Sequence, residues 1–258
     1  AIMIWFVPQI VKVVEKMVPV RSDEDEVFHL EYIGTQLMRT PELSLMEARK
    51  EVSKFGKMTK KMFGFLHELV ETDDSKKQTK LQEKIQRYED RTDELELEID
   101  DYLVKVAEGR LSAKASMEIK GILSITNDLE RIADIILRIS NDLRRKAKYE
   151  IKFTQGQKED LNTMFDIVME AFDIMEKNLN LDYSKVTLIE VVAKEDAINK
   201  KLKKLSKKHL NSLDSKNYDA RVGIVYRDVL FGLEKVGDHI INVSEGISGT
   251  LGKDEEDF

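Results

Sequence analysis

The chain has 258 residues, of which 41% are hydrophobic and 35% are charged, and its formal net charge is −7. These values exclude an intrinsically disordered chain and allow a sizeable buried core. The acidic balance argues against a nucleic-acid binder, which normally presents a basic face. The sequence contains no cysteine, so disulfides and thiolate sites are excluded, and any metal must be held by oxygen atoms or by the four histidines.

Residues 1–20 differ in composition from the rest of the chain. They are apolar from Ala1 to Val7 and become amphipathic after Pro8. They lack the basic start and the cleavage site of a signal peptide, and they are too short and too charged at their end for a complete membrane span. Two interpretations fit these residues equally well: the end of a truncated transmembrane segment, or an amphipathic helix packed on the rest of the protein.

The remainder of the sequence has the pattern of long helices. No proline follows Pro41, and apolar residues recur at intervals of three and four between a few polar or glycine-containing breaks. Ser44 and Glu47 have the spacing of a capping box, and the only strand-like stretch is VFHLEYI, which begins at Val27. The pattern predicts an all-α fold with six long helices, at about residues 44–71, 75–108, 112–150, 158–179, 184–212 and 218–248.

The second half of the sequence repeats the first. The stretch TKKMFGFLHELVE, from Thr59, resembles LNTMFDIVMEAFD, from Leu161, and DLERIAD, from Asp128, resembles GLEKVGD, from Gly232. A looser similarity links residues from Tyr88 with residues near Ala193, and the three offsets are 102, 104 and 106 residues. Because three helices recur in the same order, we expect two tandem three-helix bundles.

One motif, Glu-basic-x-x-Asp, occurs once in each half. The four-residue spacing places Glu130 and Asp134 on one helical face, and Glu234 and Asp238 on another. Like charges at this spacing repel each other, so a compensating interaction is expected.

Further carboxylates lie on the neighbouring predicted helices. Glu89, Asp93, Glu96 and Asp100 follow each other at helical spacing on the second helix, and Glu195 lies in line with apolar residues of the fifth. If the second helix packs on the third and the fifth on the sixth, these acids converge, and a hard divalent or trivalent cation is their natural counter-ion. The alternative is an acidic face exposed to solvent. The candidate metal ligands are Glu89, Asp93, Glu130, Asp134, Glu195, Glu234 and Asp238.

This arrangement resembles the PhoU family of phosphate-uptake regulators, whose hallmark is an E(D)xxxD motif on the helices of two three-helix repeats. The resemblance covers about Leu43 to Gly249. It implies a first PhoU-like repeat at residues 43–150, and a second repeat with an acidic tail at residues 151–258. It also implies a regulatory domain without enzymatic activity that modulates phosphate uptake and binds a metal ion such as iron, zinc or magnesium.

The segment HLEYIGTQLMRTPELSLMEARKEV, from His29, is similar to the junction of bacterial sodium/phosphate cotransporters, in which a PhoU-like domain follows the transmembrane part. This similarity favours a truncated or membrane-proximal segment at residues 1–20, followed by a linker at residues 21–42. It implies that the partner is the transmembrane transporter domain of the same polypeptide, at the cytoplasmic face of the bacterial inner membrane. A homodimer is left open, and no nucleic-acid partner is expected.

Some positions depart from the family pattern. The second half keeps GDHxxN at residues 237–242, whereas the first half has Arg138 at the place of Asn242. If Arg138 projects into the first acidic group, the second group should bind metal better, because a guanidinium would replace the ion. Asn199 is a poorer ligand than an acid on the fifth helix. Two alternatives remain: a carboxylate-bridged metalloenzyme, either a hydrolase or an oxidase, with His239 as its acid–base group, and a plain scaffold bundle.

Overall fold

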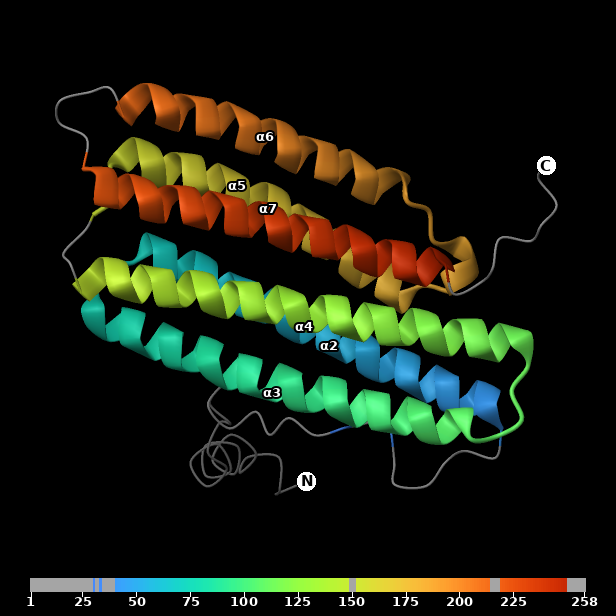
Figure 1. The fold of residues 1–258 in the computed structure, drawn as a ribbon. Helices are drawn as coiled ribbons and strands as arrows, with labels where there is room; N and C mark the ends of the chain where they lie inside the picture. Colours follow the sequence, from blue (N-terminus) through green and yellow to red (C-terminus); the bar gives the residue numbers. More distant parts are fainter. Residues whose placement is uncertain (1–29, 31–32, 34–39, 149–151, 214–218, 250–258) are drawn as a thin grey trace, which may run out of the picture. The chain divides into compact units, whose positions relative to one another are not determined.

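The computed structural model describes Leu30, Ile33 and residues 40–148, 152–213 and 219–249. The segment at residues 1–20 and the acidic tail lie outside these described residues, as do most of the linker and of the strand-like stretch. In the described ranges the chain forms six α-helices (Figure 1). They are α2 (Pro41–Glu71), α3 (Ser75–Ala107), α4 (Ala113–Lys148), α5 (Gln155–Asn180), α6 (Ile189–Leu213) and α7 (Ala220–Gly249). The all-α prediction is confirmed.

The helix ends agree with the sequence pattern except at three starts. Helix α6 begins five residues later than expected, because a 3-10 helix, η3 (Tyr183–Lys185), precedes it. Helix α2 begins at Pro41, and its N-cap is Thr40, whose hydroxyl accepts from a backbone N–H of the first turn. The predicted capping box at Ser44 is wrong, since Ser44 lies buried inside α2.

Helix α5 also starts earlier than its sequence indicates. Thr154 and Gln157 form a reciprocal capping box, in which the Gln157 backbone N–H donates to the Thr154 hydroxyl at 3.2 Å. Gly156, which precedes the expected start near residue 158, lies in the first turn of α5. A glycine is tolerated there because the N-cap already orders the first turn.

The two repeats pack against each other along two pairs of helices. Helices α2, α3 and α4 pack together in the first half, and α5, α6 and α7 in the second (Figure 1). The most extensive contact between helices in the described part joins α4 to α7, and α2 also packs against α5. The two three-helix groups therefore share a common core.

Equivalent residues of the two repeats meet where α2 contacts α5. Phe63 and Phe165 lie 102 residues apart in the sequence, and their ring centroids are 5.1 Å apart. Phe172 lies 5.0 Å from Phe63, and all three side chains are completely buried. Contact between equivalent residues is the sign of an approximate two-fold relation between the halves.

Helices α4 and α7 run antiparallel and approach each other closely. A Cβ atom at Gly232 would lie 2.6 Å from Cδ1 of Ile139, and one at Gly246 would lie 2.8 Å from Cγ1 of Ile125. As the residue number increases along α7, the residue number of its contact on α4 decreases, as expected for antiparallel helices. The absence of a side chain at these two positions allows the short distance between the helices.

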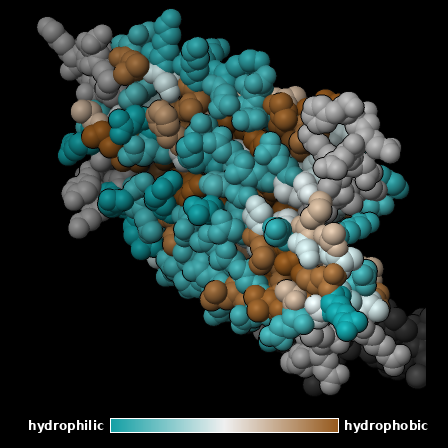
Figure 2. Space-filling model, turned by 45° about the vertical axis from the view of Figure 1, so that its right-hand side comes forward, coloured by the Kyte–Doolittle hydropathy of each residue, from teal (hydrophilic) through white to brown (hydrophobic). Residues whose placement is uncertain are grey.

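The surface of the described residues is mainly polar. Figure 2 shows a face that is largely hydrophilic, with hydrophobic residues in separate patches. Within the described ranges, none of the helices combines the length and the apolar character needed to cross a membrane.

Candidate functional site

The four predicted carboxylates of the first half lie together between α3 and α4. We call Glu89, Asp93, Glu130 and Asp134 the first acidic cluster. Burial raises the pKa of Glu89 to about 7, and the negative charges of Asp93, Asp90 and Asp134 add to the shift. A carboxyl with this pKa is about half protonated at neutral pH.

Glu130 and Asp93, two further members of the first acidic cluster, respond to the same environment. Burial raises the pKa of Glu130 to about 7, with further contributions from Asp134, Glu96 and Asp93. Burial also raises the pKa of Asp93, followed by the charge of Asp134. The expected pairing of α3 with α4 therefore brings these acids within electrostatic reach of one another.

The second half has a corresponding group that is electrostatically different. Burial raises the pKa of Glu195, and the charges of Asp238 and Glu245 add to it, so α6 faces α7 as expected. The Nζ atom of Lys235 lies 2.7 Å from Oδ2 of Asp238 and 3.5 Å from Oε2 of Glu234. A single ammonium group therefore lies beside two of the predicted metal ligands and offsets part of their charge.

The side-chain positions bear on the predicted metal sites. Among the residues that the structure describes, no three histidine, aspartate or glutamate side chains are placed to hold one metal ion. Metal binding at the seven carboxylates therefore stays a prediction. The electrostatics of the first acidic cluster favour a bound cation more than those of the second group. The acids of the first cluster repel one another, whereas Lys235 already supplies a positive charge to the second group.

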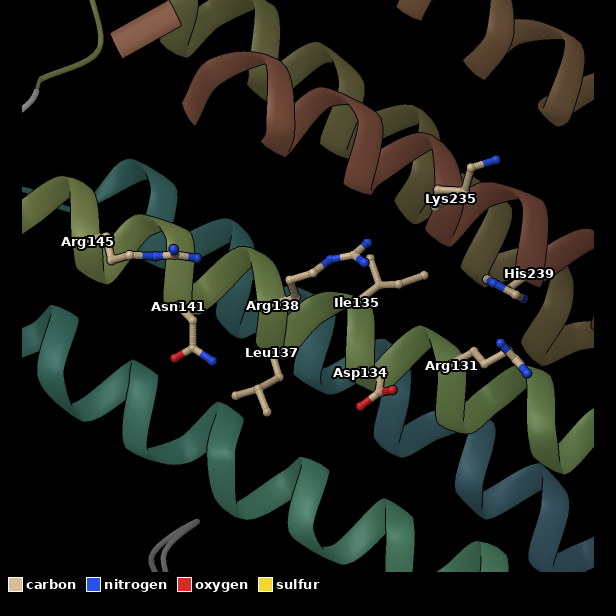
Figure 3. A pocket seen from close by; sticks show the side chains of 9 residues that line it. All are labelled: Arg131, Asp134, Ile135, Leu137, Arg138, Asn141, Arg145, Lys235 and His239. Atoms are coloured by element: carbon tan, nitrogen blue, oxygen red, sulfur yellow. The ribbon is translucent and has the colours of Figure 1, made fainter. Parts of the chain in front are cut away.

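Arg138 does not meet the condition that would weaken the first acidic cluster. In Figure 3, Asp134, Leu137 and Asn141 extend from α4 toward α3, whereas Arg138 extends toward α7. Its guanidinium therefore does not replace a cation between α3 and α4.

A polar contact that the sequence did not reveal joins α4 to α7. The Nδ1 atom of His239 lies 2.8 Å from Oδ1 of Asp128, and the Asn242 side-chain amide donates to the same oxygen at 3.2 Å. Asp128 is buried. Two residues of the GDHxxN sequence thus bind the neighbouring helix, and His239 is engaged in this contact. Asp128 lies two residues before the first motif, but its partner depends on how α4 and α7 are aligned.

A pocket of about 580 Å³ opens beside this contact, between α4 and α7 (Figure 3). Helix α7 contributes Lys235 and His239, and α4 contributes the other side chains of the lining. Four of the lining residues are cationic and one is a carboxylate. The lining consists of Arg131, Asp134, Ile135, Leu137, Arg138, Asn141, Arg145, Lys235 and His239.

Residues 52–143, which cover most of α2, all of α3 and most of α4, match the family model of the PhoU domain. Over these residues the chain is similar to the PhoU domain family. It is 26% identical over 186 residues to a protein of Thermotoga maritima named phosphate-specific transport system accessory protein PhoU homolog 1. This alignment covers 70% of the chain and 77% of the relative.

Two crystal structures of PhoU proteins share the fold. The phosphate transport system regulatory protein PhoU from Streptococcus pneumoniae superposes with a TM-score of 0.66 at 15% identity, over 81% of this chain and 95% of that protein. PhoU from Pseudomonas aeruginosa gives a TM-score of 0.63 at 17% identity, over 80% and 96% of the two chains. The six helices therefore form a PhoU-like fold.

Proposed function

We propose that this chain is a PhoU-type regulator of phosphate transport and not an enzyme. The observation that carries the proposal is the PhoU domain match at residues 52–143, within a complete six-helix PhoU-like fold. The relative from Thermotoga maritima is named as an accessory protein of a phosphate-specific transport system. The structure from Streptococcus pneumoniae is that of a phosphate transport system regulatory protein.

The geometry also favours a regulator over the two alternatives. His239, the acid–base candidate of a metalloenzyme, has one of its two ring nitrogens, Nδ1, committed to Asp128 in the contact between α4 and α7. A plain scaffold would keep its acids solvated, whereas burial raises the pKa of both Glu89 and Glu130 to about 7. Such destabilising carboxylates suit a ligand-responsive site.

We further propose that the regulated transporter is a sodium-dependent phosphate transporter, and that its transmembrane domain belongs to the same polypeptide. The support is the similarity of the sequence from His29 to a cotransporter junction, together with the apolar run from Ala1 to Val7. The regulator would then act at the cytoplasmic face of the bacterial inner membrane.

A metal ion is the third part of the proposal. A hard cation in the first acidic cluster would be held by Glu89, Asp93, Glu130 and Asp134. It would offset the cost of burial, and the smaller repulsion between the acids, that raise the pKa of Glu89, Asp93 and Glu130. This binding requires some of the carboxylates to rotate toward a common point. When bound, the ion would supply positive charge that joins α3 to α4.

The function is tested by phosphate uptake in cells that carry the gene. Deletion should change the uptake of labelled phosphate and remove its dependence on the external phosphate concentration. Restoring the full-length gene should restore that dependence, and so should Lys203→Gln, which changes an exposed lysine of α6. Uptake that is the same with and without the gene, at low and at high phosphate, would refute the proposed function.

The metal is tested on the purified full chain by elemental analysis and by thermal melting with and without a chelator. The double variant Glu130→Gln with Asp134→Asn should lose the metal and the chelator effect. The matched variant Glu234→Gln with Asp238→Asn should keep both, because Lys235 already pairs with these acids. If the purified chain contains no metal and the chelator does not change its melting temperature, the first acidic cluster does not bind a cation.

A further inference from the structure

The two halves differ in one polar interaction at the contact between α4 and α7. The motif repeats after 104 residues, so Gly232 is the equivalent of Asp128, Ile135 of His239, and Arg138 of Asn242. In one copy, the Asp128 carboxylate binds His239 and Asn242. In the other copy, Gly232 has no side chain to offer.

The equivalent residues lie near one another in this copy as well, although Ile139 fills the space that a side chain at Gly232 would need. A Cβ atom at Gly232 would lie 3.8 Å from Cγ2 of Ile135, so the equivalent residues are neighbours here as well. Arg138 stands where Asn242 stands in the other copy, and it lines the pocket between the two helices (Figure 3). Asn242 has the Asp128 carboxylate as its acceptor. Arg138, at the equivalent position, has no such carboxylate beside it.

Arg138 has no hydrogen bond or ion pair within the part of the chain that the structure describes. The other cations of the lining are partly engaged: Arg131 donates to the Asn127 side chain at 2.9 Å, Arg145 pairs with Asp142, and Lys235 pairs with Asp238. Asp134, the only carboxylate of the lining, extends toward α3, away from Arg138 (Figure 3). Arg138 is thus the cation most open to an external anion.

We propose that this pocket binds a small anion with two or more linked phosphoryl groups, and that Arg138 makes the main contact. The ligand supplies Arg138 with the acceptor that the described residues do not provide. Guanidinium groups bind phosphoryl oxygens in pairs of parallel hydrogen bonds, which favours phosphate over a simple halide. This inference concerns a ligand and stands whether or not the chain regulates transport.

The dimensions of the pocket favour a linear anion over a single phosphate. A volume of about 580 Å³ is that of a small-molecule site and exceeds the need of one phosphate ion. Arg131 and Arg145 each lie seven residues from Arg138, which is about 10 Å along a helix. A single phosphate at Arg138 would leave both neighbours largely unused, whereas a phosphoryl chain could reach at least one of them.

The test is isothermal titration of the purified full chain with tripolyphosphate, ATP and inorganic phosphate. Tripolyphosphate should bind about tenfold more tightly than phosphate, and binding should weaken as salt is added. Equal affinity for tripolyphosphate and ATP would mean that the phosphoryl chain is recognised, and tighter binding of ATP would assign the site to a nucleotide.

Three variants make the outcome decisive. Arg138→Gln should weaken tripolyphosphate binding on the order of tenfold, and Arg131→Gln should weaken it less. Lys203→Gln removes the same charge from an exposed position of α6 and should leave binding unchanged. Tripolyphosphate should also raise the melting temperature of the parent protein, but not that of Arg138→Gln. No binding of any probe, or equal binding by Arg138→Gln, would overturn the proposal.

Discussion

The two helix contacts that join the halves differ in how far they keep the two-fold relation of the repeat. Where α2 meets α5, Phe63 and its equivalent Phe165 touch each other and are equally buried. Where α4 meets α7, Asp128 has a glycine as its equivalent, and Arg138 has an asparagine. Packing thus preserves the two-fold relation at one helix pair, while polar chemistry breaks it at the other. The comparison indicates that the core maintains the fold and that the α4–α7 contact carries what differs between the halves.

The largest expected effect tests the symmetric side. Phe63→Ala and Phe165→Ala should each lower the free energy of unfolding by about 3–5 kcal/mol, since each removes a fully buried ring and leaves a cavity. The two losses should be similar, because the residues are equivalent and share one contact. Urea denaturation at constant pH measures both. A loss below 1 kcal/mol in one variant and not in the other would show that the halves are not equivalent at α2 and α5.

A medium effect tests the asymmetric side. Asp128→Ala should lower the free energy of unfolding by about 1–3 kcal/mol, because His239 and Asn242 would lose their common acceptor, a buried carboxylate. Asp196→Ala, which changes an exposed acid of α6, serves as the control and should stay within about 0.5 kcal/mol. Equal free energies of unfolding for the two variants would mean that the polar contact does not stabilise the packing of α4 on α7.

Sequence periodicity was sufficient for the helices and for the first acidic cluster. The absence of proline after Pro41 and the regular apolar spacing located all six helices. Consecutive helices with short connections pack as antiparallel neighbours, so α3 had to face α4 and bring Glu89 and Asp93 near Glu130 and Asp134. The residue pattern along each single helix is therefore enough to predict the helices and the first acidic cluster.

The α4–α7 contact could not be predicted from the same pattern. His239 and Asp128 lie 111 residues apart, and their meeting depends on the alignment of two helices from different halves. Lys235 appeared in the sequence only as the basic residue of the motif, yet its ammonium group lies within ion-pair distance of both Glu234 and Asp238. The N-caps Thr40 and Thr154 could not be predicted because capping depends on backbone geometry as well as on residue type.

The smallest expected effect compares the two acidic groups through pH. The ordinary pKa of glutamate is 4.5, and that of Glu130 in the folded chain is about 7. The folded state therefore binds more protons than the unfolded state between these values, and this group lowers the stability as the pH rises from about 4.5 to 7. Above pH 7 the full destabilisation is present. Glu89 contributes with the same sign.

Glu130→Gln removes the charge that is unfavourable in the folded state. At pH 8, in the presence of a chelator, it should raise the stability by about 1 kcal/mol, since solvent still screens part of the repulsion, and the melting temperature by about 2–4 °C. The gain should shrink toward pH 5, where the folded protein already holds the proton. The equivalent variant Glu234→Gln should give no gain at pH 8, because Lys235 pairs with that carboxylate. Equal gains in both variants would mean that the two acidic groups have the same electrostatic environment, contrary to the difference between the halves described above.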